Sequence, residues 1–441
     1  MTPAALSVPS AILALAALTS GCRSLPIETT PTALVVDGAT LVRADRGERR
    51  AETRIVVEGD RIRCVGAPHE CPVPAHARRL EGRGRFVVPG LFDAHVHTSQ
   101  RLAQVAPLYL AFGITSVREM GGFPDFTRSL QNSIRAGTLL GPRIFTSGRP
   151  IDGAPSVWPI AGVAREVRTA DEARAAVRAS LADGADFIKL YNALPLELVR
   201  AATVEAHALG VRVAIDHILR GPEVVDTGVD GVEHLVPPPP MGRNLTQRFS
   251  DAGAAAPMTQ VLKRMQARGI ALTTTMVLMD RVQAGGLAES EPTYAALPPP
   301  LRARSREMLA GVDGPMAAFM RATQRYACEQ VREFAALGGT ILAGTDSYFL
   351  SSYPGDLHRE LELLVDCGLT PAQALVAGTS APARWLGLQD VGVVEAGARA
   401  DFLLLRADPL QDIRATRQIE WIVQGGQVHT QTDILRTGAS R

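Results

Sequence analysis

The chain has 441 residues, of which 46% are hydrophobic, and its formal net charge is +1. This is enough apolar material for a large core with a satellite domain. The near-neutral charge gives no electrostatic reason to expect nucleic acid or an anionic membrane surface as a partner.

The first element is a short apolar run, Ala11 to Leu18, followed by small residues and Cys22. The run is too short to cross a bilayer as a helix, and it predicts a signal peptide over residues 1–21. Cys22 would then be the lipidated first residue of a mature lipoprotein, with a linker over residues 22–32. We expect an exported protein, either periplasmic or lipid-anchored to the bacterial envelope. Because no Lys or Arg precedes the run, a cytoplasmic protein is the alternative.

Short alternating runs separated by Gly and Asp turns fill residues 33–85, and the same texture returns over residues 400–428. Such runs are typical of antiparallel hairpins. We therefore predict that residues 33–88 and 386–435 pair into one small β-sandwich domain. Within this domain, Cys64 and Cys71 either close a small disulfide loop or remain two buried thiols.

Between these segments, over residues 89–385, apolar strands alternate with amphipathic helices, which is typical of a parallel sheet with crossover helices. Capping boxes at Thr169 and Thr370 mark two helix starts. Eight strand–helix units fit a (β/α)8 TIM-like barrel, and no GxGxxG motif follows the first strand to favour a doubly wound open sheet. The predicted strands end near His97, Glu119, Ser147, Tyr191, His217, Leu235, Met276 and Asp346.

The ends of these strands carry side chains that bind metal ions. In a barrel of this kind, functional residues lie at the C-terminal strand ends. Four of the nine histidines, His95, His97, His217 and His234, lie there, and Asp346 ends the eighth strand. Imidazole and carboxylate groups are the usual ligands of zinc and similar ions. We therefore predict a metal centre.

Strand four carries Lys189 in an apolar run, and the only other lysine is Lys263. Because Lys can lose its proton and react whereas Arg cannot, this position invites a chemical explanation. A neutral amine near two divalent ions is poised to become a carbamate, which the ions stabilise.

Two further side chains are candidates for substrate contact. Tyr191 lies two residues after Lys189 and should face the same cavity, where its phenol could bind substrate or simply pack. Arg118 could bind a substrate carboxylate through two hydrogen bonds, or it could pair with Glu119 or Asp93.

The strand-end residues resemble those of the amidohydrolase superfamily, specifically its imidazolonepropionase-like and prolidase-like branch. The resemblance extends to five other segments: Val88-Pro89-Gly90-Leu91, Gly113–Arg118, Gly141-Pro142-Arg143, Leu357–Leu361 and the tail Gly397–Asp401.

The resemblance implies a centre of two divalent metal ions, and zinc is the ion that we expect. His95 and His97 would hold one ion, and His217 and His234 the other. Lys189, carboxylated to N6-carboxylysine, would bridge both ions. Asp346 would ligate the first ion and shuttle protons.

The resemblance also implies a metal-dependent hydrolase in which a hydroxide bridging the two ions attacks a carbonyl. We expect cleavage of an amide (C–N) bond in a small peptide or N-acyl amino acid. A cyclic amide, a lactone or an ester is the alternative substrate class. A non-catalytic scaffold with the same fold is a third possibility, against which the complete ligand set argues. The expected partners are a small-molecule substrate and further copies of the chain, with membrane contact only through Cys22.

Two positions depart from the family pattern. Glu119 follows Arg118 where Arg-Asp is common, and Asp216 precedes His217 where a small residue is usual. By alternation along the strand, we expect the Asp216 side chain to point away from the metal ions. We also expect residues 280–325 and 236–241 to form a lid over the site.

Overall fold

The computed structural model describes residues 33–97, 102–158, 160–216, 222–234, 258–284, 291–310, 314–347 and 352–439. The predicted signal peptide with Cys22, the ligand candidate His217 and the lid segment 236–241 all lie outside the described residues. In the described part, no helix combines the length and the apolar character needed to span a membrane.

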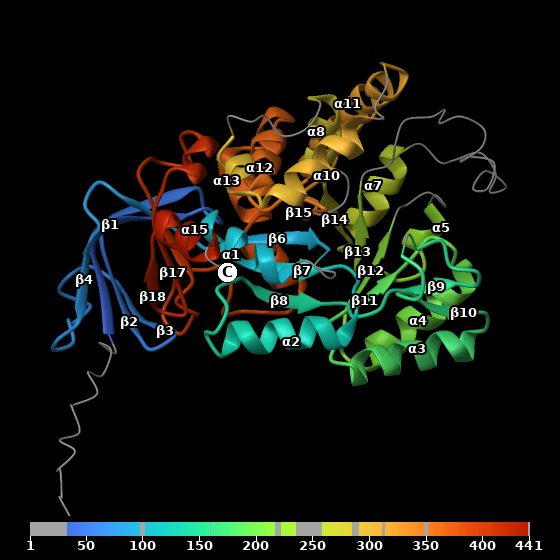
Figure 1. Cartoon of the computed structure of the whole chain (residues 1–441), viewed down its shortest axis with the longest axis horizontal. Coiled ribbons are helices and arrows are strands. Elements are labelled where there is room, and N and C mark those ends of the chain that lie inside the picture. Colours follow the sequence, from blue (N-terminus) through green and yellow to red (C-terminus); the bar gives the residue numbers. More distant parts are fainter. Residues whose placement is uncertain are drawn as a thin grey trace, which may run out of the picture.

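The two ends of the chain meet in one eight-stranded sheet on one side of the molecule (Figure 1). Its junction is the antiparallel pair of β5 with β16, which joins N-terminal to C-terminal strands. All eight strands belong to one sheet, so the predicted pairing of the chain ends is present, whereas a sandwich of two sheets is not confirmed. The strands are β1 (Ala33–Arg43), β2 (Glu48–Glu58), β3 (Arg61–Gly66), β4 (Arg78–Glu81), β5 (Phe86–Pro89), β16 (Phe402–Leu405), β17 (Ile419–Gln424) and β18 (Gln427–His429).

The middle of the chain contains two parallel sheets. One has three strands, β6 (Leu91–Val96), β7 (Ile114–Glu119) and β8 (Arg143–Thr146). The other has seven, in the spatial order β10 (Arg165–Val167), β9 (Ile151–Gly153), β11 (Ile188–Leu190), β12 (Val213–Asp216), β13 (Gly231–Glu233), β14 (Ala271–Thr274) and β15 (Ile341–Ala343). An α/β fold with parallel strands is thus confirmed, and the eight predicted strand ends lie within three residues of observed ones.

The three-stranded sheet contacts the seven-stranded sheet at both of its own edges. Val96 at the end of β6 forms a parallel bridge with Ser347, just beyond β15. At the other edge, the backbone N–H of Asp186 donates to the carbonyl oxygen of Thr146 over 2.7 Å. These contacts join the sheets without making one continuous ladder, so the sheet pairing alone does not confirm a closed barrel.

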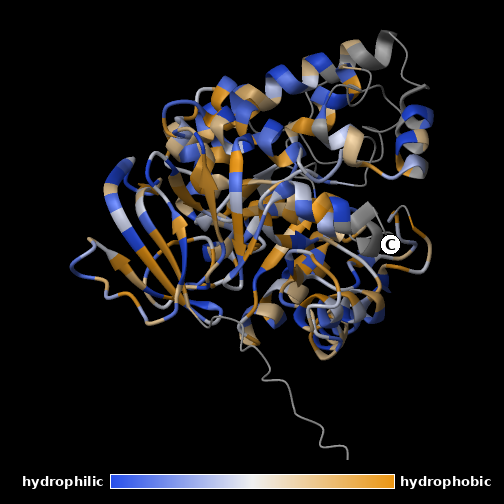
Figure 2. Cartoon of the chain, turned by 60° about the vertical axis from the view of Figure 1, so that its left-hand side comes forward, coloured by the Kyte–Doolittle hydropathy of each residue, from blue (hydrophilic) through white to orange (hydrophobic). Residues whose placement is uncertain are grey.

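Helices connect the parallel strands and turn polar faces outward, whereas the strands carry mainly hydrophobic residues (Figure 2). Both predicted capping boxes are present, at Thr169 and Thr370. The helices are α1 (Leu102–Ala111), α2 (Pro124–Arg135), α3 (Ala170–Ala182), α4 (Leu196–Ala208), α5 (Pro222–Val225), α7 (Met258–Ala267), α8 (Met276–Gln283), α9 (Pro292–Ala296), α10 (Pro299–Ala310), α11 (Gly314–Ala336), α12 (Asp356–Asp366), α13 (Pro371–Ala377), α14 (Ser380–Trp385), the 3₁₀ helix η1 (Ile413–Arg417) and α15 (Gln431–Ala439).

Two disulfides crosslink the chain. Cys64–Cys71 closes the loop after β3, which decides between the two alternatives that the sequence left open. Cys328 in α11 and Cys367 at the end of α12 form a second disulfide, which we did not predict. It ties the long α11 to the helix that follows the last parallel strand.

Candidate metal centre

The ends of β6 and β15 bring His95, His97 and Asp346 together. Nε2 of His97 lies 3.1 Å from Oδ1 of Asp346, and Nε2 of His95 lies 3.6 Å from the same oxygen. Two tetrahedral ligands bound to zinc at about 2.0–2.2 Å are roughly 3.3–3.6 Å apart. The spacing of these donor atoms therefore suits a single shared ion.

Around these residues, the backbones of the two strands lie unusually close together. The Asp346 N–H donates to the carbonyl oxygen of His95 over 2.8 Å, and Asp346 has a φ of 52°, which is uncommon outside glycine. A Cβ on Gly344 would lie only 2.7 Å from the His95 Cβ, so glycine is required where the two strands meet. Asp93 links the same strands, because its carboxylate accepts from the hydroxyl and the N–H of Thr345.

Two atoms of this group that could ligate a metal ion have no hydrogen-bond partner within the described part of the chain. They are Nε2 of His95 and Oδ1 of Asp346. Both atoms are buried, and an unsatisfied buried polar atom costs about 1–3 kcal/mol. Burial also lowers the pKa of His95 well below its ordinary value, which keeps the ring neutral with a lone pair for a cation. The residues present thus fit a metal ion.

The ring of His95 is oriented by Glu233, a residue that we did not single out from the sequence. Nδ1 of His95 donates to Oε2 of Glu233 over 2.8 Å, which leaves Nε2 for the metal side. A carboxylate behind a ligating imidazole is a common arrangement that fixes the tautomer and the ring orientation.

Arg118 lies on the other side of Glu233, and the structure does not support the substrate contact that we expected for it. The guanidinium is fully buried and donates to both carboxylate oxygens of Glu233 at 2.7 and 2.8 Å. It also lies over the ring of Trp385, 4.4 Å from the ring centre. We had also considered that Arg118 pairs with Glu119 or Asp93. It does pair with a carboxylate, but that carboxylate belongs to Glu233.

Substituting Glu233→Gln should destabilise the fold by roughly 3–5 kcal/mol, because it leaves the buried Arg118 charge uncompensated. It should also weaken metal binding by about 10–100-fold, since His95 loses its orienting carboxylate. Urea unfolding and metal titration measure the two effects. Arg174→Gln breaks the exposed Arg174–Asp171 pair and should change stability by less than about 1 kcal/mol. Equal effects of the two substitutions would contradict the interpretation.

A second group of polar side chains lies at the ends of β11, β12 and β13. Nζ of the buried Lys189 lies 2.9 Å from Oδ1 of Asp216, and Nε2 of His234 lies 3.2 Å from the same oxygen. The rings of His95 and His234 are 4.6 Å apart between centres, so the two groups adjoin. Nδ1 of His234 is paired with the Thr275 hydroxyl over 2.8 Å, which again turns Nε2 toward the site.

The expected orientation of Asp216 is wrong. In the β11–β12 ladder, Lys189 pairs with Ala214, and paired residues of parallel strands place their side chains on the same face. Asp216 is two residues beyond Ala214 and therefore shares the face of Lys189. His234 reaches the site by a different route, since its φ of 66° turns the backbone away from the alternation of the strand.

Comparisons with known proteins show similarity to amidohydrolases. The amidohydrolase family model matches residues 257–428. Imidazolonepropionase of Rubrobacter xylanophilus is 29% identical over 391 residues, covering 80% of this chain and 84% of that protein. The chain thus resembles the amidohydrolase superfamily over most of its length. A match to adenine deaminase of Cenarchaeum symbiosum, at 30% identity, spans only 21% of that protein.

Solved structures with the same fold include prolidases. A prolidase complexed with N-methylphosphonate-L-proline aligns at a TM-score of 0.71 with 22% identity, covering 90% of this chain and 100% of that one. A Xaa-Pro dipeptidase with bound methionine aligns at a TM-score of 0.68 with 20% identity, over 90% and 100% of the two chains. Our assignment to the imidazolonepropionase-like and prolidase-like branch of the amidohydrolases is confirmed.

Aromatic rings line one side of the candidate metal site, beside its histidines; we call them the aromatic wall. The ring of Trp158 lies 5.6 Å from that of His97 and 4.6 Å from that of Tyr191, both edge-to-face. Sequence reasoning identified Tyr191 but missed Trp158, which lies in the loop between β9 and β10. Asp152 anchors this loop, because its Oδ2 accepts from the Val157 N–H and from the Ser156 hydroxyl, each over 2.8 Å.

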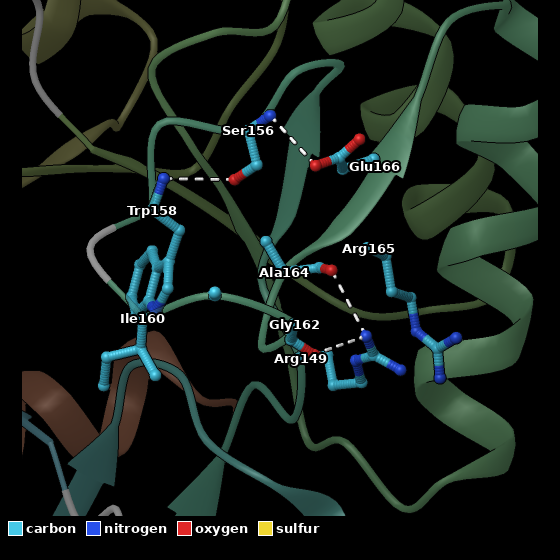
Figure 3. Close-up of a pocket in the computed structure, with 9 residues that line it drawn as sticks. Arg149, Ser156, Trp158, Ile160, Gly162, Ala164, Arg165 and Glu166 are labelled. Carbon is cyan, nitrogen blue, oxygen red and sulfur yellow. Dashed lines mark hydrogen bonds between the residues drawn. The ribbon is translucent and has the colours of Figure 1, made fainter.

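Trp158 also lines a surface hollow of about 640 Å³ (Figure 3). The rest of its lining comes from the same loop, from Arg165 and Glu166 of β10, and from Arg149, whose guanidinium donates to carbonyl oxygens of residues 162–164. The indole Nε1 of Trp158 is buried and has no hydrogen-bond partner in the described structure. Trp158 thus presents both an apolar face and a spare N–H donor beside the metal-binding residues.

Proposed function

We propose that the chain is a binuclear metal-dependent amidohydrolase that cleaves an amide bond of a small peptide or an N-acyl amino acid. The observation that carries the proposal is the buried group His95–His97–Asp346, whose donor atoms have ligand spacing and include two without partners in the described structure. The prolidase and dipeptidase neighbours support the substrate class.

We also propose that the two parallel sheets are arcs of one (β/α)8 barrel. Contacts at both edges support this, because Val96 reaches Ser347 and Asp186 reaches Thr146. In such a barrel, all the candidate ligands would lie at the same C-terminal end.

In this proposal, His95, His97 and Asp346 would hold one ion, His234 and His217 would hold the other, and carboxylated Lys189 would be shared by both. When bound, the two divalent ions, which we propose are zinc, would lower the pKa of water and polarise the scissile carbonyl. The chain itself positions the donors: Glu233 orients His95, and Thr275 orients His234.

Asp346 and Tyr191 are proposed to act on protons and on substrate. Burial would raise the pKa of Asp346, but the surrounding imidazoles of His95 and His97 lower it below its ordinary value. The carboxylate therefore stays ionised and can accept a proton from the attacking water and pass it to the leaving amine. Burial and nearby carboxylates raise the pKa of Tyr191, so its phenol remains a hydrogen-bond donor to a substrate oxygen.

A cyclic amide is the second candidate substrate, because two relatives that match over most of their length are imidazolonepropionases. Water activated in the same site would attack the carbonyl of a ring amide or a lactone by the same chemistry.

The deciding experiment assays the purified, metal-analysed protein on three matched panels: Xaa-Pro and other dipeptides with N-acyl amino acids, cyclic amides, and lactones or esters. We expect release of an amino acid from the first panel. Turnover confined to cyclic amides or lactones would replace the substrate class, and a protein that bound no metal would overturn the mechanism.

Trp158→Ala should lower kcat/KM by about 10–100-fold, because burying an apolar group of side-chain size contributes about 1.5–3 kcal/mol. The loss should appear mainly in KM, as expected when binding is lost equally in ground and transition states. Val157→Ala, at the neighbouring exposed position, is the matched control and should leave kcat/KM unchanged. If Trp158→Ala behaved like the control, the aromatic wall would have no role in binding.

We further propose that the chain is exported and anchored through Cys22. The two disulfides support this proposal, because disulfides persist mainly in oxidising compartments such as the periplasm. Mass spectrometry of protein from the cell envelope should find a lipid on Cys22; a chain that retains residues 1–21 would contradict it.

A further inference from the structure

We infer that Asp216 is a direct metal ligand at the end of β12, in the second half of the site. This inference rests on the proposed binuclear function and assigns to that centre a carboxylate that we had expected to point elsewhere. The bound group would be a divalent transition ion shared with His234 and with the carboxylated form of Lys189, and Asp216 would take the place that the proposed function gives to His217.

The first argument is the spacing of the donor atoms. Oδ1 of Asp216 and Nε2 of His234 are 3.2 Å apart. This is close to the roughly 3.3 Å expected between two tetrahedral ligands bound at about 2.0 Å. It also matches the spacing of His97 and Asp346 in the first half of the site, which is 3.1 Å.

The second argument is the way in which Asp216 is held. The side-chain amide of Asn192 donates to Oδ2 of Asp216 over 2.9 Å, so Oδ1 alone faces His234 and Lys189. Ligating carboxylates are typically hydrogen-bonded by neighbouring groups in this manner. A hydrogen bond thus orients Asp216, in the same way that Glu233 orients His95 and Thr275 orients His234.

The third argument is charge. Glu233 is balanced by Arg118, whereas Asp216 is balanced by the Lys189 ammonium. Carboxylation would convert that ammonium into an anion and place two negative charges side by side at Oδ1 of Asp216. Buried charges of the same sign are strongly unfavourable, and a metal ion at Oδ1 is the cation that the neighbouring donors can bind.

The test counts bound metal rather than turnover. Wild-type protein, Asp216→Ala and Asp216→His are loaded with zinc, desalted and analysed for metal, and their Co²⁺ forms are compared by visible absorption. We expect two equivalents in the wild type, one in Asp216→Ala with an altered Co²⁺ band, and two again in Asp216→His, because imidazole also ligates. Asp152→Ala, which removes a buried carboxylate from β9 on the far side of β11, is the control and should retain two.

Two results would overturn the inference. One is that Asp216→Ala keeps both equivalents while His217→Ala loses one, which would make His217 the ligand from this strand. The other is that Asp216→Ala loses metal and Asp216→His does not recover it, which would make Asp216 a positioning residue only. If the wild type itself bound no metal, the proposed function would fail, and that outcome is distinct from either.

Discussion

Lys189→Ala is expected to lose most of its bound metal and to lower kcat/KM by more than about a hundredfold. This exceeds the loss of about 10–100-fold that is typical when a residue hydrogen-bonded to a metal ligand is replaced. Lys189 is buried and contacts Asp216 at the junction of the two ligand groups. In our proposal, its carboxylated side chain bridges both ions, so the truncation removes a ligand from each. Metal analysis and steady-state kinetics measure the two losses.

Chemical rescue gives this prediction its specificity. Short-chain carboxylic acids such as acetate or propionate should partly restore metal and activity to Lys189→Ala, because a carboxylate can occupy the position of the carbamate. Lys263→Ala is a matched control, since Lys263 is the only other lysine and is exposed on α7. An unrescued Lys189→Ala with full metal content and activity would refute the bridging role.

The positions of the candidate ligands along the chain could be predicted because they depend on local signals. Apolar runs of strand length, two capping boxes and Gly or Asp turns place the strand ends, and the ligands lie at those ends. His95, His97 and Asp346 do come together, although they are separated by some 250 residues in the sequence. The parallel bridge between Val96 and Ser347 provides that proximity, as a barrel topology would.

The orientation of side chains at the strand ends could not be predicted, because it depends on the register between strands. Alternation within one strand does not say which of its two faces points inward. For Asp216, this is set by the pairing of Lys189 with Ala214. For His234, it is set by a backbone turn with positive φ, for which no glycine or asparagine gave a signal.

Contacts between polar residues far apart in the chain could not be predicted from the sequence either. Arg118 and Glu233 are 115 residues apart, and nothing local links them. The same is true of Trp158, which reaches the site from a loop that has no periodic pattern. The second disulfide joins Cys328 to Cys367 across 39 residues, a pairing that spacing alone does not determine.

Asp346→Asn should retain much of the metal but lower kcat by about 10²–10⁴-fold, the usual contribution of a positioned acid–base group. The amide keeps an oxygen that can ligate, with nearly the same shape, yet it cannot take up a proton from the attacking water. Its environment supports this separation of roles, because Oδ1 lies near Nε2 of both His95 and His97.

Metal content and kcat must be measured on the same preparation, since the prediction is a loss of turnover at nearly constant metal. Asp346→Ala is the matched comparison: it removes the ligand oxygen as well, so both metal and turnover should fall. If Asp346→Asn lost metal as completely as Asp346→Ala, Asp346 would be needed for binding rather than for proton transfer. If it kept wild-type kcat, another group would have to carry the proton, and Tyr191 would not suffice because its raised pKa keeps the phenol protonated.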